Sequence, residues 1–484
     1  MRRLGARELI QATVDPGSWV SWDEPIVRAG LDPAYAEELA AAEAKAGTDE
    51  AVITGRARVE GHDVVLVVGE FRFLGGSVGA ETASRVVAAV RRATELRLPV
   101  IAATSSGGTR MQEGTPAFVS MIDISRAVVD HKAAGLPYLV YLRHPTTGGV
   151  FASWASLGHV AVAEPGALIG FLGPVVYQTL HGRAFPEGVQ TAENLVAKGV
   201  LDAVVQADEL APVAARALRL LTGGRADLAT LPTAPAAYDV DVKVPDAWEA
   251  IETTRREDRP GARELLAHVA SDVVPLHGTQ AGEADSGLLT VVASIRGISC
   301  LVIAQDRRAQ ALKGPLGPAS LRAARRGMQL AEQLRLPLVS LIDTPGADLS
   351  AEAEEGALAP EIARCLADMV QLSVPTVAVL MGEGCGGGAL ALLPARRVVA
   401  ARNAWLSPLP PEGASAILYG TADRAAEMAR RQRVRADDLA EIGIVHAVVD
   451  ESSPAHLDPE RFLDALADEV IRQFAWQGLR VPNH

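Results

Sequence analysis

Two glycine-rich turns between an apolar strand and a helix are the best candidates for chemistry in this sequence. They are Gly148-Gly149 and Gly387-Gly388. Consecutive glycines allow a sharp backbone turn, and the helix that follows adds unpaired N–H groups and the positive end of its dipole. Such a turn can stabilise an oxyanion or hold a phosphate. Two of them suit a reaction with two developing oxyanions, although the same glycines would also allow tight strand–helix packing.

Three other segments carry weaker signals. The run Leu74-Gly75-Gly76-Ser77-Val78-Gly79 resembles a loose nucleotide-binding loop, but it matches neither GxGxxG nor the GK[ST] motif. In Ser106-Gly107-Gly108-Thr109-Arg110 a cation follows a flexible loop, so Arg110 could hold an anionic substrate or pair with a buried carboxylate such as Glu113. Cys385 stands at a helix start, which lowers a thiol pKa. Because no His or carboxylate adjoins it as a base, we interpret it as a small spacer.

Other catalytic and metal-binding patterns are absent from the sequence. The ten histidines form no HExxH motif, and the three cysteines, Cys300, Cys365 and Cys385, form no CxxC pair. No GxSxG motif stands between a strand and a helix, which disfavours an α/β-hydrolase. We therefore expect no metal site.

The elements that position these residues occur twice along the chain. Residues 95–99 (Glu-Leu-Arg-Leu-Pro) match residues 333–337 (Gln-Leu-Arg-Leu-Pro), and three further landmarks recur in the same order at nearly the same spacing. Each copy predicts a strand pair, a glycine loop with a helix, a strand, a second helix, another strand and a glycine-rich turn that leads into a third helix. In the first copy these lie at 51–69, 74–97, 99–104, 115–134, 137–143 and 148–158; in the second at 288–304, 313–335, 337–342, 356–372, 375–381 and 386–393. Strands alternating with helices predict an α/β fold with mostly parallel sheets.

Between the copies, a Pro/Ala-rich stretch at 231–237 is typical of a linker. We therefore predict two domains, residues 1–228 and residues 229–484. The apolar positions of 459–478 recur at helical spacing and predict an amphipathic C-terminal helix that packs in a core or an interface. These positions are Phe462, Leu463, Leu466, Val470, Ile471 and Phe474.

Composition limits the class of protein. Apolar residues make up 49% of the 484 and charged residues 22%, which is ordinary for a globular chain. The net charge of −13 argues against nucleic acid as the main partner. No run approaches the ~18 apolar residues of a membrane span, and the start of the chain has no apolar secretory segment. Few cysteines suit a reducing cytoplasm.

At these motifs the chain resembles the carboxyltransferase component of biotin-dependent acyl-CoA carboxylases. The first half is similar to the bacterial acetyl-CoA carboxylase β subunit and the second half to its α subunit, in order over roughly residues 50–450. The matching segments of the first half are Phe71-Arg-Phe-Leu-Gly-Gly-Ser-Val-Gly79, Ser106-Gly-Gly-Thr-Arg-Met-Gln-Glu-Gly114, Pro145-Thr-Thr-Gly-Gly-Val150 and Ala163-Glu-Pro-Gly-Ala-Leu-Ile-Gly-Phe-Leu-Gly-Pro174. Those of the second half include Asp258-Arg-Pro260, Ile342-Asp-Thr-Pro-Gly-Ala347, Gly382-Glu-Gly-Cys-Gly-Gly-Gly-Ala-Leu390 and Pro411-Glu-Gly-Ala-Ser-Ala-Ile-Leu418.

The resemblance implies two tandem crotonase-like (ClpP/crotonase) ββα superhelix domains. It implies transfer of a carboxyl group from carboxybiotin, borne by a separate carrier protein, to the α-carbon of acetyl-CoA or another short acyl-CoA. The product would be malonyl-CoA or a substituted malonyl-CoA, as used in fatty acid and polyketide biosynthesis. Substrate and cofactor supply the base, so no side-chain base is expected. By motif, Gly148 and Gly149 would hold the thioester oxyanion, Gly387 and Gly388 the biotin ureido oxygen, and Gly75, Gly76, Ser77, Gly107, Gly108 and Arg110 would lie at the acyl-CoA.

The resemblance also implies partners. A biotin carboxyl carrier protein and a biotin carboxylase would act with this chain, and a homodimer or larger oligomer would form because paired domains come from different protomers. The chain departs from the family in lacking the four-cysteine zinc ribbon of the β subunit and in several second-half polar positions, among them Thr279, Gln280 and Pro410. Three alternatives remain: a biotin-independent malonyl-thioester decarboxylase, a crotonase-type hydratase, isomerase or hydrolase, and a non-enzymatic assembly subunit.

Overall fold

The computed structural model describes residues 3–26, 28, 30–223 and 244–478. Contacts divide the chain into two compact units, Met1–Thr222 with Gln280–Gly282, and Gly223–Thr279 with Glu283–His484. The predicted boundary between residues 228 and 229, and the Pro/Ala-rich stretch, lie outside the described residues. The strand pairs, helices and glycine turns predicted for each copy fall within one unit each.

The first unit is built on one sheet with the strand order β1-β2-β3-β4-β5-β6-β8, to which β7 adds beside β5. The pairings β1–β2 and β2–β3 are antiparallel, and all later pairings are parallel. The strands are β1 (Val20–Ser21), β2 (Val52–Val59), β3 (His62–Gly69), β4 (Val100–Ser106), β5 (Tyr138–Thr147), β6 (Val160–Ala163), β7 (Ile169–Gly170) and β8 (Ala203–Val204).

The sheet of the second unit repeats this topology. Its order is β9-β10-β11-β12-β13-β14-β16, with β15 beside β13, and only the β9–β10 and β10–β11 pairings are antiparallel. The strands are β9 (Ala270–Leu276), β10 (Leu288–Ile295), β11 (Ile298–Gln305), β12 (Leu338–Thr344), β13 (Thr376–Cys385), β14 (Arg397–Ala401), β15 (Trp405–Ser407) and β16 (Ala447–Val449). The same strand order and the same antiparallel edge confirm that the chain holds two copies of one α/β domain.

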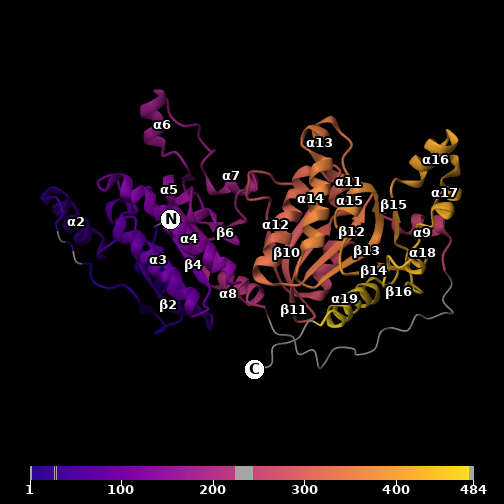
Figure 1. Cartoon of the computed structure of the whole chain (residues 1–484), viewed down its shortest axis with the longest axis horizontal. Coiled ribbons are helices and arrows are strands. Elements are labelled where there is room, and N and C mark those ends of the chain that lie inside the picture. Colours follow the sequence, from indigo (N-terminus) through magenta and orange to yellow (C-terminus); the bar gives the residue numbers. More distant parts are fainter. Residues whose placement is uncertain (1–2, 27, 29, 224–243, 479–484) are drawn as a thin grey trace. The chain divides into compact units, whose positions relative to one another are not determined.

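Equivalent helices pack on the two sheets. In the first unit α3 (Ala80–Glu95) lies against α4 (Gly114–Ala133), and in the second α12 (Pro318–Leu334) lies against α14 (Leu358–Gln371) (Figure 1). Every residue of β4 is buried, as is every residue of β12 and β13. Strands covered on both faces read as continuous apolar runs, which explains why the strands could be recognised in the sequence.

The C-terminal helix α19 (Pro459–Trp476) forms as predicted, and all six residues of its apolar stripe are buried. It packs on the second sheet, contacting β13, β14 and β16. The stripe therefore belongs to the core of the second unit. No helix among the described residues is long and apolar enough to cross a membrane.

The helix predicted over 148–158 is much shorter in the structure. It is a single turn, α5 (Gly148–Phe151), followed by a short 3-10 turn at Trp154–Ser156. Two glycines at its start weaken the helix, and the Ser153 hydroxyl donates a hydrogen bond of 2.5 Å to the Gly149 carbonyl. This side-chain bond competes with the backbone bonds that would continue the helix.

Candidate functional site

The first glycine turn lies where β5 ends and α5 begins. Gly148 has φ +63°, and a Cβ there would lie 3.2 Å from the Gly108 Cα, so only glycine suits this position. The Gly148 N–H donates to the Phe171 carbonyl at 3.0 Å and is therefore occupied. The N–H of Gly149 belongs to the first helical turn, where N–H groups have no acceptor within the helix. The Gly149 N–H could therefore serve an oxyanion, whereas the Gly148 N–H, for which the sequence predicted the same role, already has an acceptor.

The glycine loops predicted to bind substrate gather around this turn. The Gly107 N–H donates to the Gly75 carbonyl at 2.8 Å, and Gly76 lies so close to β4 that a Cβ would be 2.1 Å from the Ser105 oxygen. Ser77 closes its own loop, because its hydroxyl donates to the Leu74 carbonyl at 2.8 Å. The loop at Gly75 and Gly76 and the loop at Gly107, about 30 residues later, therefore form one backbone surface. This surface lies beside Gly148 and Gly149, about 70 residues after the first loop.

The second glycine turn has the same construction, shifted by one residue from the predicted correspondence. Strand β13 ends at Cys385 and α15 (Gly386–Leu390) follows, with Gly386 at φ +61°. Gly386 thus corresponds to Gly148 and Gly387 to Gly149, whereas the sequence paired Gly387-Gly388 with Gly148-Gly149. A Cβ at Gly388 would lie 3.3 Å from the Ala347 nitrogen. The three glycines let this turn approach the loop after β12.

A buried carboxamide holds the second turn. Gln305, at the end of β11, donates to the Gly388 carbonyl at 2.7 Å and accepts the Asp343 N–H at 3.1 Å. Its side chain is fully buried. Thr344 fixes the adjoining loop in the same way, since its hydroxyl accepts the Gly346 N–H at 3.2 Å and donates to Gln310 at 2.7 Å. Neutral amide and hydroxyl groups therefore shape this turn.

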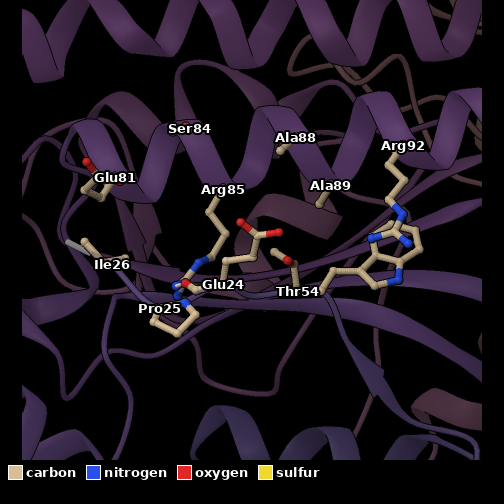
Figure 2. A pocket seen from close by; sticks show the side chains of 11 residues that line it. Glu24, Pro25, Ile26, Thr54, Glu81, Ser84, Arg85, Ala88, Ala89 and Arg92 are labelled. Carbon is tan, nitrogen blue, oxygen red and sulfur yellow. Dashed lines mark hydrogen bonds between the residues drawn. The ribbon is translucent and has the colours of Figure 1, made fainter.

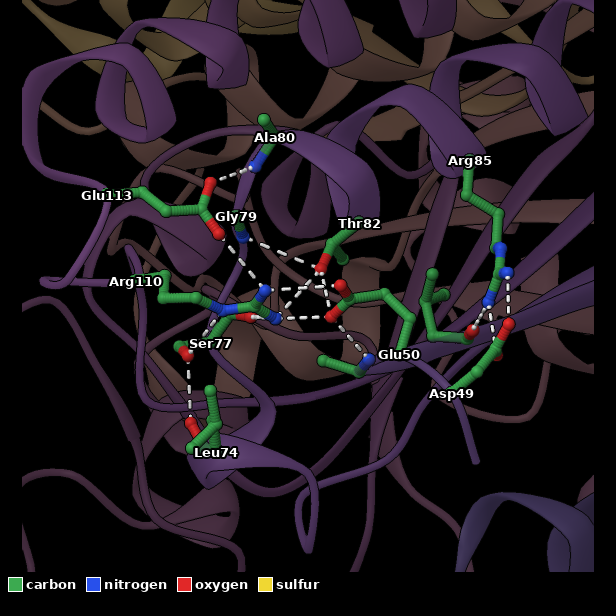
Figure 3. Close-up of polar contacts among 12 residues, drawn as sticks. Asp49, Glu50, Leu74, Ser77, Gly79, Ala80, Thr82, Arg85, Arg110 and Glu113 are labelled. Atoms are coloured by element: carbon green, nitrogen blue, oxygen red, sulfur yellow. Dashed lines mark hydrogen bonds and ion pairs between the residues drawn. The ribbon is translucent and has the colours of Figure 1, made fainter. Parts of the chain in front are cut away.

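Arg110 is not available to an anionic substrate, which corrects the prediction that it binds one. Its side chain is 1% exposed and pairs with Glu50 and with Glu113, the latter at 3.2 Å (Figure 3). The guanidinium also donates to the Ser77 carbonyl at 2.9 Å and to the Thr82 hydroxyl at 3.2 Å. Burial by itself would lower the pKa of Arg110, but its contacts with Glu50 and Tyr35 raise it above the ordinary value. The other reading of the sequence, a pair with a buried carboxylate, is correct.

Hydrogen bonds around Arg110 shift the pKa values of its neighbours. Burial, with a hydrogen bond of 2.5 Å from its hydroxyl to Glu113, raises the pKa of Tyr35 to about 12. Burial would raise the pKa of Glu113, but hydrogen bonds from Tyr35 and from the Ala80 N–H hold it below its ordinary value. Glu113 is therefore a carboxylate at neutral pH, and it stabilises both Arg110 and the N-terminus of α3.

Two buried acids lie near the second turn, on β12 and β13. Asp343 accepts the Glu383 N–H at 3.1 Å, and Glu383 pairs with Arg255 at 3.0 Å. Burial raises the pKa of both carboxyl groups. Burial also raises the pKa of Cys385 to about 12, so the thiol stays protonated despite its place at a helix start. This agrees with its interpretation as a spacer.

A groove in the first unit lies away from the glycine turn. It encloses about 530 Å³ between α3 and the segment that precedes β2, with Glu24 and Thr54 facing Arg85 and Arg92 (Figure 2). None of the predicted site residues lines it. Among the described residues, no cluster of three or more His, Cys, Asp or Glu side chains could hold a metal ion.

Sequence reasoning did not find three residues that shape the two turns. Glu50 and Tyr35 come from segments 60 and 75 positions before Arg110, with which both form hydrogen bonds, and no local pattern marks either of them. Gln305 is the last residue of an apolar strand, and in the sequence a polar residue at that place only indicates where the strand ends. Such a role can be recognised only once the structure shows that the polar side chain is buried and hydrogen-bonded.

Comparisons with known proteins agree with this architecture. Residues 2–477 match the carboxyl transferase domain family. A probable biotin-dependent acyl-coenzyme A carboxylase beta3 subunit of Mycobacterium tuberculosis is 52% identical over 98% of this chain and 94% of the relative. The acetyl-coenzyme A carboxylase carboxyl transferase subunits beta/alpha of Saccharopolyspora erythraea are 37% identical over 93% of this chain and 81% of that protein.

Solved structures share the fold. Transcarboxylase 12S, described as a hexamer with methylmalonyl-coenzyme A bound, superposes with a TM-score of 0.75 at 22% identity, covering 100% of this chain and 92% of that one. A single-chain, multi-domain long-chain acyl-CoA carboxylase gives a TM-score of 0.76 at 21% identity, covering 98% of this chain and 46% of that one. The prediction of two tandem crotonase-like domains is confirmed. The chain belongs to the carboxyl transferase domain family and is an enzyme, a carboxyltransferase of the biotin-dependent acyl-CoA carboxylase type.

Proposed function

We propose that this chain transfers a carboxyl group from carboxybiotin on a separate carrier protein to the α-carbon of acetyl-CoA or another short acyl-CoA. The product would be malonyl-CoA or a substituted malonyl-CoA. The observation that carries the proposal is the pair of glycine turns at the equivalent ends of β5 and β13, each of which begins a short helix. The names of the relatives support the same reaction class.

The first turn suits a thioester whose carbonyl oxygen becomes negative. The Gly149 N–H would donate to that oxygen as the enolate develops, and a fixed backbone donor needs no reorganisation during the reaction. Gly75, Gly76, Ser77, Gly107 and Gly108 would hold the rest of the acyl-CoA against the backbone. No side chain of this unit is assigned as a general base, in accord with the pairing of Arg110 with Glu50 and Glu113.

The second turn suits the ureido oxygen of biotin. A Cβ at Gly387 would lie 2.7 Å from the Ile362 Cδ1, and one at Gly388 would press on the loop after β12, so these glycines leave a cradle that side chains would fill. The N–H groups of Gly387 and Gly388 would donate to the oxygen there. Biotin, when bound, would supply the carboxyl group and the base that removes the α-proton.

The same proposal includes partners. A biotin carboxyl carrier protein and a biotin carboxylase would deliver the carboxyl group, and the chain would work as a homodimer or larger oligomer in the cytoplasm. Transcarboxylase 12S assembles as a hexamer, which supports an oligomer here.

The test is turnover of malonyl-CoA by the full chain, with and without free biotin, followed by analysis of the acyl-CoA products. Biotin-dependent formation of acetyl-CoA supports a carboxyltransferase running in reverse, and methyl- or ethyl-substituted malonyl-CoA then maps the acyl pocket. Equal conversion without biotin would refute the proposal in favour of a malonyl-thioester decarboxylase. Gly149→Pro removes the proposed donor, and a loss of turnover with retained folding is expected. The matched variant Gly173→Ala changes a glycine of the same unit with φ −64°, where a Cβ meets no atom.

A further inference from the structure

We propose that Arg110 is a positioning residue for the acyl-CoA half of the site, fixing the two glycine loops 74–79 and 106–110 against each other. This inference rests on the function proposed above. Arg110 follows Gly107 and Gly108 in the chain, while its guanidinium reaches the other loop at Ser77. A single side chain therefore joins the two segments that would hold the substrate.

Backbone hydrogen bonds also align the two loops. The Val78 N–H donates to the Gly108 carbonyl at 2.8 Å, and the Arg110 N–H donates to the Val78 carbonyl at 2.9 Å. The second unit contains the same arrangement, in which the Asp348 N–H donates to the Leu316 carbonyl at 2.9 Å. Asp348 occupies the place of Arg110, and its carboxylate only accepts bonds from nearby Ser350. The position of Arg110 is thus held by a carboxylate in the second unit, whose bonds stay within its own loop.

The network of Arg110 extends to the elements behind the loops. Glu50, which is 1% exposed, accepts from both terminal nitrogens of the guanidinium. Glu113 accepts from Arg110 and also from the Ala80 N–H at 2.6 Å, where α3 begins (Figure 3). A Cβ at Gly79 would lie 2.2 Å from Glu113, so the loop is pressed directly against these charges. A guanidinium can make these bonds because its donors form a rigid planar fork.

A lysine cannot reproduce this geometry, since it presents one compact charge on a flexible stem. In Arg110→Lys the charge opposite Glu50 remains while the bonds to Ser77 and Thr82 cannot all be kept. We expect the two loops to move relative to each other. A displacement of about 1 Å in groups that hold a substrate can lower the catalytic rate strongly.

The experiment compares Arg110→Lys with Arg85→Lys in the full chain. Arg85 is a matched control: it is a buried arginine on α3 of the same unit, its partners are Asp23 and Asp49, and it contacts neither loop. Steady-state kinetics of the malonyl-CoA reaction with free biotin gives the KM of each substrate. Amide hydrogen exchange of residues 74–79 and 106–110 reports loop order without any turnover.

We expect Arg110→Lys to raise the KM of malonyl-CoA about tenfold or more, to leave the KM of biotin unchanged, and to speed exchange in both loops. Arg85→Lys should lower thermal stability without these effects. Equal changes in both variants, or an equal rise in the two KM values, would overturn the proposal. If the wild type converts neither malonyl-CoA nor a methyl- or ethyl-substituted malonyl-CoA, the proposed function is wrong, and loop exchange alone then decides the role of Arg110. Should Arg110→Lys not fold, Glu113→Gln is expected to change the same readouts in the same direction.

Discussion

Alanine substitutions at Gly76 and at Gly75 together test the close contact between the glycine loop and β4. Both residues have positive φ, +63° and +65°, so alanine has the same conformational penalty at each. A Cβ at Gly75 would meet no atom within 4 Å, whereas one at Gly76 would lie 2.1 Å from the Ser105 carbonyl oxygen. The difference between the two variants therefore isolates the contact.

The expected losses of unfolding free energy follow from the backbone strain and from the steric contact. A left-handed alanine costs about 1–2 kcal/mol of unfolding free energy, which is the whole effect expected for Gly75→Ala. Forcing extra volume into a packed position typically costs about 1–3 kcal/mol more, and Ser105 is held in the centre of the sheet between β3 and β5. Gly76→Ala should therefore lose about 2–5 kcal/mol. In a domain of this size 1 kcal/mol shifts Tm by about 2–4 °C.

Differential scanning calorimetry of both variants and the wild type measures this difference on the same transition. We expect the Tm of Gly76→Ala to lie well below that of Gly75→Ala. If the two variants melt together, the loop does not press on β4, and the close backbone surface derived for the first turn is wrong.

Three further outcomes are expected. Gln305→Leu leaves the Asp343 N–H and the Gly388 carbonyl without their partner in a buried place, and should lower the free energy of unfolding by about 2–5 kcal/mol in urea titration; an unchanged midpoint would contradict the role of the carboxamide. Burial lowers the pKa of His131 from its ordinary 6.5 to about 4, so the unfolded chain binds more protons between these values and stability falls as pH drops from 6.5 to 4, by about 3 kcal/mol at most; His131→Gln should flatten this part of the Tm–pH curve, and an equal slope in the variant would refute it. Burial raises the pKa of all three cysteines to about 12, so iodoacetamide at pH 8 should label the native protein slowly and the urea-unfolded protein fully, as counted by mass spectrometry; rapid labelling of Cys385 in the native state would show an accessible thiolate.

The duplication and most elements could be predicted from the sequence because they depend on local order. Buried parallel strands give continuous apolar runs, as at 100–106 and 338–344, and glycine marks the turns that follow. The motifs around Gly148 and Gly387 identified the family for the same reason, since each is a short contiguous segment. The helix after Gly148 was predicted too long, because the Ser153 side chain that ends it competes with helix bonds that its sequence alone favours.

The role of Arg110 and the support of the second turn were decided by tertiary structure. The sequence left Arg110 with two readings, and only the fold brings Glu50 and Tyr35 to its guanidinium from 60 and 75 positions away. Likewise Gln305 meets Gly388 across 83 positions. A buried charge or amide is defined by which distant groups remove it from water and satisfy it. The spacing of residues along the sequence predicts the turns and strands. Which buried polar groups pair depends on how those strands lie beside one another in the fold.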